Sequence, residues 1–339
     1  MRFNNHVLTD KLSKVVFLGE SLTALTAIYK GHIKPHVIID VWEGGSSLYG
    51  WDFAGKCIDR LPILTRSKCY ILNDEKYVQV KPIVEVVGSE DGFTDKITSR
   101  IPDTIQINWL DTMSEGGYML LNGWCSMLRK LKSKVVNVSK IYGEIKYIHL
   151  DRSVIKVGWR KEIRYAKIVN TLPLPYFTSK IITMDNNVKR VSDMELGLSY
   201  VSLYIMTLIA SKSDISLEKS KVIKVGKKGF LTALIFMLPM NYVYGLNDLV
   251  LIYVLSPITL DTLKPELSSK ILSELRRLNV LTNFKSIYFY RDHFERYAIL
   301  GESRGKINDF MNTLRGYGIE FMGRLGSWKD VWICDVLEN

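Results

Sequence analysis

The stretch VVFLGESLTALTAIYKGHIKPHVIIDVWEGG, residues 15–45, contains an apolar run, a glycine turn, a helical segment and a second apolar run. This order predicts a strand, a helix and a second strand, the βαβ unit that opens many parallel sheets. An acid and a glycine pair, Glu43, Gly44 and Gly45, follow soon after the second run. We therefore expect a Rossmann-like α/β domain to begin here.

The turn after the first strand departs from the usual pattern of this unit. The spacing G-x-G-x-x-G brings the backbone N–H groups of a helix N-terminus close to a pyrophosphate. Here Gly19, Ser21 and Ala24 fill the three positions. Serine is the smallest polar replacement and its hydroxyl can donate to a phosphate oxygen, while Ala24 still allows close packing of helix on strand.

Glu43 is expected at the end of the second strand, where an acid accepts from the hydroxyls of an adenosine ribose. The alternative is that Gly19 forms an ordinary strand-to-helix turn and that Glu43 is an ordinary surface acid. The 15–45 segment alone does not separate these two interpretations.

Length and charge narrow the class of protein. The chain has 339 residues, 47% of them apolar, which is enough for two domains and a large core. Its net charge of +11 is spread along the chain without a nucleic-acid-binding motif, so we expect no nucleic acid partner. An anionic cofactor or an anionic small-molecule substrate fits this charge. The longest uncharged run, residues 196–211, contains Ser, Thr and Tyr and predicts a buried strand rather than a transmembrane segment.

Cysteine and histidine show no metal-binding spacing. No C-x-x-C pair occurs among Cys57, Cys69, Cys125 and Cys334, and the five histidines are scattered. The cysteines therefore suggest a reducing, cytoplasmic location. Only two glutamines in a chain rich in Ile, Lys, Tyr and Val fit a thermophilic source.

The remaining chain has a readable order of elements. Short strands are expected within 57–88, a helix after Gly117, and four strands within 135–177. Three long apolar segments, within 193–212, 229–239 and 248–257, predict strands of one antiparallel sheet. Residues 262–281 predict an amphipathic helix, and the end of the chain predicts a strand, a helix, a strand and a glycine-arginine turn.

Three motifs together carry a family resemblance. They are the acid and glycine pair in VWEGGSSLYGW, the strand end KIVNTLPLPYF with its T-x-P-L-P pattern, and the C-terminal GIEFMGRLGSWKDVWICDVL with its G-R-x-G-x-W-K pattern. With these motifs in this order, the sequence resembles FAD-dependent oxidoreductases of the flavin amine oxidase superfamily. That superfamily includes protoporphyrinogen oxidase-like proteins and UDP-galactopyranose mutase.

The resemblance implies a Rossmann-like FAD/NAD(P)-binding domain and a second α+β domain with an antiparallel sheet. It implies a discontinuous FAD-binding domain at 14–60, 122–185 and 285–339, and a substrate domain at 61–121 and 186–284. It also implies FAD as the cofactor, with binding residues at Gly19, Ser21, Ala24, Glu43, Gly44, Gly45, Val136, Thr171, Gly323, Arg324 and Asp335. Gly326 and Trp328 belong to the same C-terminal motif.

The implied activity is oxidation of a small molecule with hydride transfer to the flavin. Substrate-side candidates are Arg60, Arg66, Tyr200, Tyr204, Tyr242 and Arg291, although tyrosines at strand spacing are also typical of sheet packing. Ser21, Arg60 and a short final helix depart from the family pattern. A cofactor-free binding module and a sugar-nucleotide mutase-like flavoenzyme are therefore the alternatives.

Overall fold

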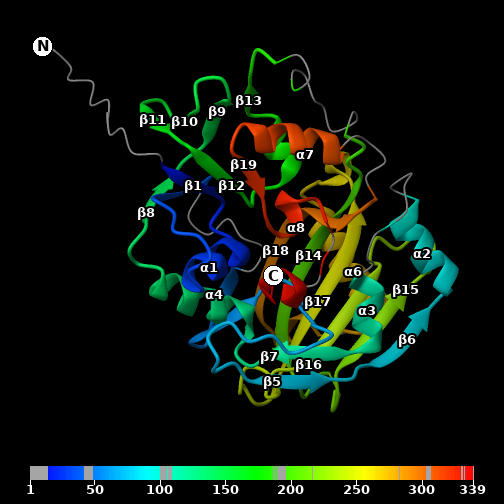
Figure 1. Cartoon of the computed structure of the whole chain (residues 1–339). Helices are drawn as coiled ribbons and strands as arrows, with labels where there is room; N and C mark the ends of the chain where they lie inside the picture. The colour runs from blue at the N-terminus through cyan, green and yellow to red at the C-terminus, as the bar shows by residue number, and fades with distance from the viewer. Residues whose placement is uncertain are drawn as a thin grey trace, which may run out of the picture. The chain divides into compact units, whose positions relative to one another are not determined.

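The structure is a computed structural model that describes residues 14–41, 49–99, 105, 109–185, 188, 196–215, 217–281, 283–302, 307–329, 331 and 333–338. Its contacts divide the chain into two compact units, each made of three segments. The first unit is Met1–Ser46, Leu131–Leu198 and Ser303–Lys329, and the second is Ser47–Lys130, Ser199–Glu302 and Asp330–Asn339. Figure 1 shows the chain with labels on many of its elements.

A parallel five-stranded sheet with the order β19-β12-β1-β2-β8 forms the centre of the first unit. Its strands are β1 (Val15–Leu18), β2 (Val37–Asp40), β8 (Ser139–Tyr142), β12 (Lys167–Asn170) and β19 (Ile319–Phe321). The VIID run of β2 is buried throughout, and only the first residue of β1 is partly exposed. Continuous apolar burial is what a parallel sheet covered on both faces requires.

Helices and a small second sheet complete the first unit. The helices are α1 (Leu22–Tyr29), α5 (Leu174–Thr178), α7 (Ile307–Gly316) and α8 (Gly323–Gly326), and α4 (Gly123–Lys134) ends in it. The small sheet has the order β11-β10-β9-β13, with β9 (Ile145–His149), β10 (Val154–Val157), β11 (Lys161–Arg164) and β13 (Ile181–Ile182). The segment after the WRKE turn therefore splits into β11 and β12, which belong to two different sheets.

The second unit is built on a six-stranded sheet with the order β18-β14-β17-β16-β15-β6. The strands are β6 (Ile83–Val87), β14 (Tyr200–Ser211), β15 (Lys221–Val225), β16 (Leu234–Pro239), β17 (Leu249–Ile258) and β18 (Ile287–Leu300). All neighbours are antiparallel except β15 and β6. The three long segments predicted from the sequence are β14, β16 and β17, and they do share this sheet.

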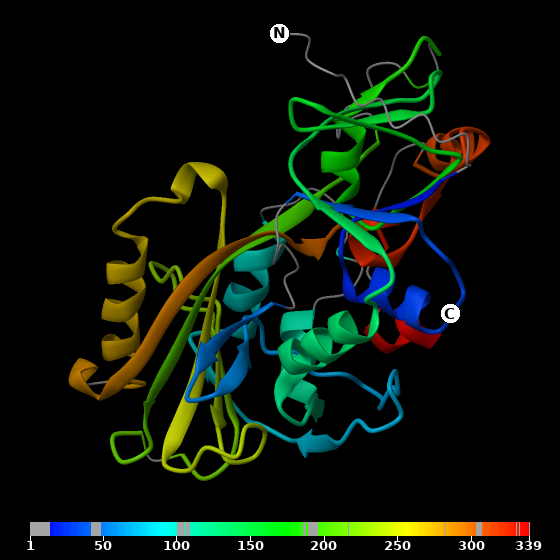
Figure 2. The same cartoon turned by 90° about the vertical axis from the view of Figure 1, so that its left-hand side faces the viewer.

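Both faces of this sheet are covered, which explains its long buried strands. Leu267, Ile271 and Leu275 of α6 (Leu267–Arg277) pack on one face. The other face carries Ile58 of β4 (Lys56–Asp59), which pairs with β3 (Gly50–Phe53), and residues of the helices α2 and α3. Figure 2 shows α6 and the β3–β4 hairpin on opposite sides of the long strands. The remaining elements are α2 (Glu90–Thr98), α3 (Trp109–Glu115), β5 (Tyr77–Val80), β7 (Gly117–Leu120), the short 3-10 helices η1 (Leu260–Thr262) and η2 (Phe284–Ser286), and α9 (Ile333–Glu338).

The expected fold class is confirmed: the first unit contains a parallel Rossmann-like sheet, and the second contains a largely antiparallel sheet. The boundaries differ from the expected ones. Residues 285–302 lie in the second unit, because β18 pairs with β14 from Tyr200↔Leu300 to Ala210↔Ile287. Residues 49–60, 122–130 and 330–339 are also in the second unit.

The four cysteines form two disulfide bonds. Cys57 is bonded to Cys125 with a Cα–Cα distance of 5.8 Å, and Cys69 to Cys334 at 5.3 Å. Because disulfides are rare in reducing compartments outside hyperthermophiles, the cysteines no longer support a reducing environment. None of the described helices is long and apolar enough to cross a membrane. Within the described residues, no group of three or more His, Cys, Asp or Glu side chains is placed to hold a metal ion.

Candidate functional site

Gly19 forms the sharp turn between β1 and α1. Its φ is +95°, in the left-handed region that favours glycine, and its N–H donates to the carbonyl of Ile39 at 2.8 Å. A Cβ at this position would lie 2.6 Å from the Thr171 hydroxyl. The glycine is therefore required both by the backbone angle and by close packing against the end of β12.

Ser21 is the N-cap of α1. Its side-chain oxygen accepts from the N–H of Ala24 at 3.1 Å, so the hydroxyl is engaged within the helix end. The sequence suggests that this hydroxyl donates to a phosphate. In the structure its oxygen caps the N-terminus of α1. The lone O–H proton of Ser21 remains a donor, because capping uses the oxygen as an acceptor.

The acid at the end of β2 is Asp40 rather than Glu43. The strand ends at Asp40, and Glu43, Gly44 and Gly45 lie outside the described residues. The Asp40 carboxylate accepts from the N–H of Glu20 and from that of Val41, both at 2.7 Å. Burial raises the pKa of Asp40 despite these two hydrogen bonds. The sequence analysis selected Glu43 because the glycine pair Gly44–Gly45 follows it directly, and so it did not identify Asp40.

Glu20, between Gly19 and Ser21, is a second acid that sequence reasoning missed. Its side chain is only 2% exposed, and it contacts the ammonium groups of Lys132 and Lys140, both at 2.6 Å. The Tyr142 hydroxyl donates to it at 3.1 Å. Burial raises the pKa of Glu20, but the hydrogen bonds and charges of the two lysines outweigh burial and leave that pKa lowered. The sequence signal that could have identified Glu20 is its position as a charged residue directly after Gly19 in the turn.

The C-terminal glycine-arginine turn lies beside the start of α1. Gly323 has a φ of +73°, and a Cβ there would lie 3.0 Å from the Thr23 hydroxyl in the first turn of α1. A Cβ at Gly326 would lie 2.5 Å from the carbonyl of Asn170 at the end of β12. Gly326 and Trp328 are buried, whereas Arg324 is partly exposed.

Thr171 also lies at the turn between β1 and α1. Its hydroxyl is 2.9 Å from the carbonyl of Leu18 and 3.1 Å from that of Gly19, to which it donates. The T-x-P-L-P segment that follows β12 leads into α5, with Pro173 at its N-cap. Three predicted segments, 19–24, 171 and 323–326, therefore meet at the carboxyl end of the parallel sheet, where ligands bind in open α/β sheets.

Two predicted cofactor residues stand apart from this group. Val136 lies between α4 and β8 and is 69% exposed. Asp335 lies in α9, which belongs to the second unit and is held there by the Cys69–Cys334 bond one residue earlier. The structure assigns neither side chain to the Gly19–Thr171–Gly323 group.

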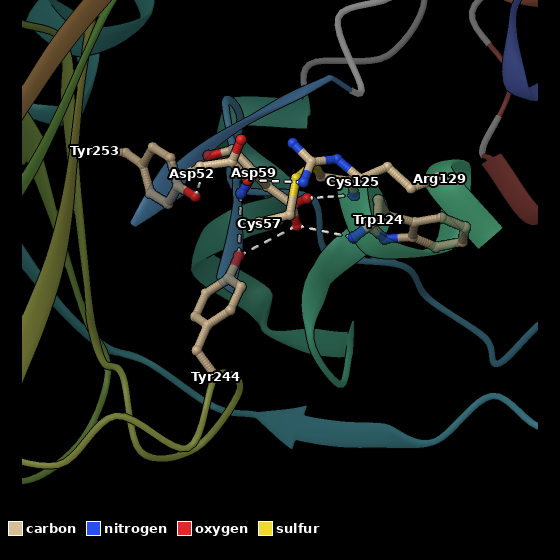
Figure 3. Close-up of a disulfide and its surroundings, with 8 residues drawn as sticks. All are labelled: Asp52, Cys57, Asp59, Trp124, Cys125, Arg129, Tyr244 and Tyr253. Atoms are coloured by element: carbon tan, nitrogen blue, oxygen red, sulfur yellow. Dashed lines mark hydrogen bonds and ion pairs between the residues drawn. A yellow bond between two sulfur atoms is a disulfide. The ribbon is translucent and has the colours of Figure 1, made fainter. Parts of the chain in front are cut away.

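A buried carboxylate, Asp59, organises the β3–β4 hairpin of the second unit (Figure 3). It accepts from the N–H groups of Trp124 at 3.0 Å and Cys125 at 2.7 Å, in the first turn of α4. The Tyr244 hydroxyl is 3.4 Å away, and the Asp59 carbonyl accepts from Tyr253 at 2.7 Å. Burial raises the pKa of Asp59 to about 7.

The substrate-side candidates differ in their surroundings. Arg66 is exposed and lies 3.8 Å from Glu115, and the Tyr242 hydroxyl donates to the carbonyl of Glu218 at 2.6 Å. Tyr204 donates to Asp292 on the α6 face of the sheet. The remaining candidates also have neighbours: Tyr200 packs on Tyr297, Arg291 donates to the Tyr290 carbonyl, and Arg60 stacks on Trp51.

Solved structures share this fold. A structure of reduced UDP-galactopyranose mutase has a TM-score of 0.69 at 11% identity, covering 94% of this chain and 89% of that chain. Wild-type putrescine oxidase bound to putrescine gives 0.63 at 9% identity, covering 96% and 98%. An oxidoreductase from Methanosarcina mazei gives 0.59 at 9% identity, covering 96% and 100%.

The chain thus shares its fold with these solved structures, and this is the fold that the motifs predict. UDP-galactopyranose mutase and putrescine oxidase are among the proteins whose fold it shares. At the level of sequence, the chain matches no family model and no curated protein.

Proposed function

We propose that the chain binds FAD in the first unit and acts as an oxidoreductase on a small molecule. The observation that carries this proposal is the meeting of the Gly19 turn, Thr171 and the Gly323–Gly326 turn at the carboxyl end of the parallel sheet. The neighbours in fold include an oxidoreductase and putrescine oxidase, which supports the same class. In this proposal the second unit is the substrate domain.

The residues present fit an ADP-containing cofactor at three points. The N-terminus of α1 points its backbone N–H groups at the same end of the sheet as Gly323. Lys132 and Lys140 bring two positive charges close to this turn, where both contact Glu20. Two left-handed glycines, Gly19 and Gly323, keep side chains away from the turn.

FAD, when bound, supplies the capacity to accept a hydride, and the protein supplies binding and orientation. In our assignment the α1 N-terminus and Arg324 hold the pyrophosphate. Asp40 keeps the turn in shape, because its carboxylate is hydrogen-bonded to the N–H of Glu20. The ribose contact is assigned to Glu43, and the flavin side to the backbone of Gly44 and Gly45.

A specific observation favours the second candidate, a cofactor-free binding module. Gly19 and Gly326 are each required by packing inside the protein, since a Cβ at either would lie within 2.6 Å of a protein oxygen. The Ser21 oxygen and the Asp40 carboxylate are also satisfied internally. These features can persist without any cofactor. A sugar-nucleotide mutase-like flavoenzyme is the remaining alternative, supported by the likeness to UDP-galactopyranose mutase.

The absorption spectrum of the purified protein decides between these candidates. Bound flavin absorbs at about 450 nm and bleaches on reduction, so the proposal expects both. Protein without this band should acquire it when FAD is added and unbound FAD is removed. A correctly folded protein that stays colourless in excess FAD supports the binding module and contradicts the proposal.

Arg324→Ala should lower FAD occupancy at least tenfold without unfolding the protein, because charge-assisted hydrogen bonds to a pyrophosphate have no neutral substitute. Lys329→Ala is the matched control, since Lys329 is an exposed cation a few residues later in the same segment. Equal occupancy in the two variants would show that the Gly-Arg turn does not hold the cofactor.

A cytoplasmic location and a thermophilic source are further inferences. Intracellular proteins of hyperthermophiles are rich in disulfides, so both cysteine pairs agree with a thermophilic source inside a cell. The low glutamine content supports the same source.

A further inference from the structure

Three polar side chains of the second unit gather on the sheet face opposite α6. Trp51 comes from β3, Arg60 directly follows β4, and His293 lies in β18 opposite Ile205. The Arg60 guanidinium carbon lies 4.2 Å from the centre of the Trp51 ring. The Trp51 and His293 rings meet edge-on with centroids 6.4 Å apart.

Four polar atoms of this cluster are buried and have no hydrogen-bond partner among the residues that the structure describes. They are Arg60 Nε, Trp51 Nε1 and both ring nitrogens of His293. Buried donors and acceptors are almost always paired, because an unpaired one loses its hydration without compensation. The neighbouring Asp59 shows the usual outcome, with both carboxylate oxygens and its carbonyl engaged. These four atoms lie on three neighbouring residues, so a single ligand can pair with all of them.

The unpaired atoms specify the chemistry of that ligand. Arg60 Nε–H and Trp51 Nε1–H are donors only. Burial lowers the pKa of His293 to about 4, and the charge of Arg60 lowers it too, so the ring is neutral at pH 7 with one donor and one acceptor. The cluster thus offers three donors and one acceptor around a cation.

Charges around the cluster are mixed. Burial lowers the pKa of Arg60, while Glu295, in β18, and Tyr49 raise it. Asp292 is engaged on the α6 face, where the Tyr204 and Tyr290 hydroxyls donate to it. The positive charge of Arg60 is therefore partly compensated by Glu295. This favours a ligand of low charge that is held by hydrogen bonds as much as by charge.

We infer that the Trp51–Arg60–His293 cluster binds an oxyanion group, a carboxylate or a phosphate, of a small molecule. Guanidinium N–H donors match the geometry of both groups, and a hydroxyl or amine beside the oxyanion would donate to the remaining His293 nitrogen. Other parts of all three residues are exposed, although these four atoms are buried. The inference rests on the proposed function in taking this molecule to be the substrate.

The test uses the full chain and titrates acetate and inorganic phosphate separately, with sodium chloride at matched ionic strength as the reference. Binding is followed by the melting temperature and by the NMR signals of the His293 ring. We expect at least one of the two anions to raise the melting temperature beyond chloride and to shift the His293 signals in a saturable way. The anion that does so identifies the ligand as a carboxylate or a phosphate.

Three variants assign the effect. Arg60→Lys keeps the charge but removes Nε–H, and His293→Gln removes the ring; each should weaken anion binding at least tenfold. Arg66→Ala is the matched control, because Arg66 is an exposed arginine of the same unit that lies near Glu115, and it should bind like the wild type. No response beyond chloride in the wild type, or equal weakening in all three variants, overturns the inference.

The result is separable from that of the proposed function. Anion binding in a protein that takes up no FAD leaves the inference standing and removes the flavoenzyme. A yellow protein that shows no response to either anion supports the flavoenzyme and overturns the inference.

Discussion

The backbone angle of Gly19 and the Thr171 hydroxyl next to it restrict this position in two separate ways. Gly19→Ala should lower the free energy of unfolding by more than the 1–2 kcal/mol expected for a left-handed alanine alone, because its Cβ would also lie 2.6 Å from the Thr171 oxygen. Gly31→Ala is the control for the angle, since Gly31 has a φ of +76° with nothing within 4 Å of a Cβ. Chemical denaturation measures both, and equal losses would show that the Thr171 contact adds nothing.

Asp59 makes stability depend on pH in the direction opposite to that of an ordinary ion-paired acid. Its pKa is raised from 3.8 to about 7 by burial, so the folded protein keeps a proton that the unfolded chain releases. The free energy of unfolding should therefore fall as pH rises from about 4 to about 7, by at most about 1.4 kcal/mol per pH unit from this group. Above that range the contribution is constant.

Asp59→Asn removes this titration, so the wild type should lose stability relative to the variant between about pH 4 and about pH 7. Urea unfolding at several pH values measures the difference. Asp52→Asn is the matched control in the same hairpin, because the hydrogen bond to Arg129 lowers the pKa of Asp52 instead. A constant difference between wild type and Asp59→Asn across this range would contradict a raised pKa.

At the scale of elements, Glu274 connects α6 by hydrogen bonds to the segment that leads into β16. Its carboxylate accepts from the Leu231 N–H at 2.7 Å, the Thr232 N–H at 2.9 Å and the Thr232 hydroxyl at 2.7 Å. Thr232 is fully buried, so no water can replace the lost acceptor easily. Glu274→Ala should lower the free energy of unfolding by about 2–3 kcal/mol.

Glu266→Ala is the control for the helix, because Glu266 is exposed at the N-cap of α6 and makes no side-chain capping hydrogen bond. It should change stability by less than about 0.5 kcal/mol. Thermal unfolding followed by circular dichroism compares the two variants. If Glu266→Ala lowers the free energy of unfolding as much as Glu274→Ala does, the effect comes from the helix itself and not from the hydrogen bonds of Glu274 to Leu231 and Thr232.

At the scale of the whole molecule, both disulfides lie within the second unit. Cys57 and Cys125 are 68 residues apart, and Cys69 and Cys334 are 265 apart, so each bond restricts a long loop of the unfolded chain. Replacing the pair Cys57 and Cys125 with alanine should lower the free energy of unfolding by about 2–4 kcal/mol.

Denaturation with and without a reducing agent checks this prediction. The reducing agent should destabilise the wild type and leave unchanged a variant without any of the four cysteines. Four reactive thiols in the denatured but unreduced protein would show that the bonds are absent.

Much of the fold could be predicted from local signals. The runs VVFL and VIID, the long apolar strands of the six-stranded sheet and the apolar spacing of Leu267, Ile271 and Leu275 each depend on neighbouring residues. Motif residues mark the Gly19 turn and the Gly323 turn, and their role in holding a cofactor stays a prediction. The place of β18 was not predictable in this way, since its pairing with β14 joins segments far apart in the chain.

The sequence by itself therefore determined the order of elements, the glycine turn after β1 and the class of fold, because periodicity and backbone angle are local properties. Only the tertiary structure decided the two disulfides, the contact of Glu20 with Lys132 and Lys140, and the cluster of Trp51, Arg60 and His293. Each of these joins residues from different elements, and their distances depend on how sheets and helices pack. A side chain's partners, burial and pKa follow from that packing.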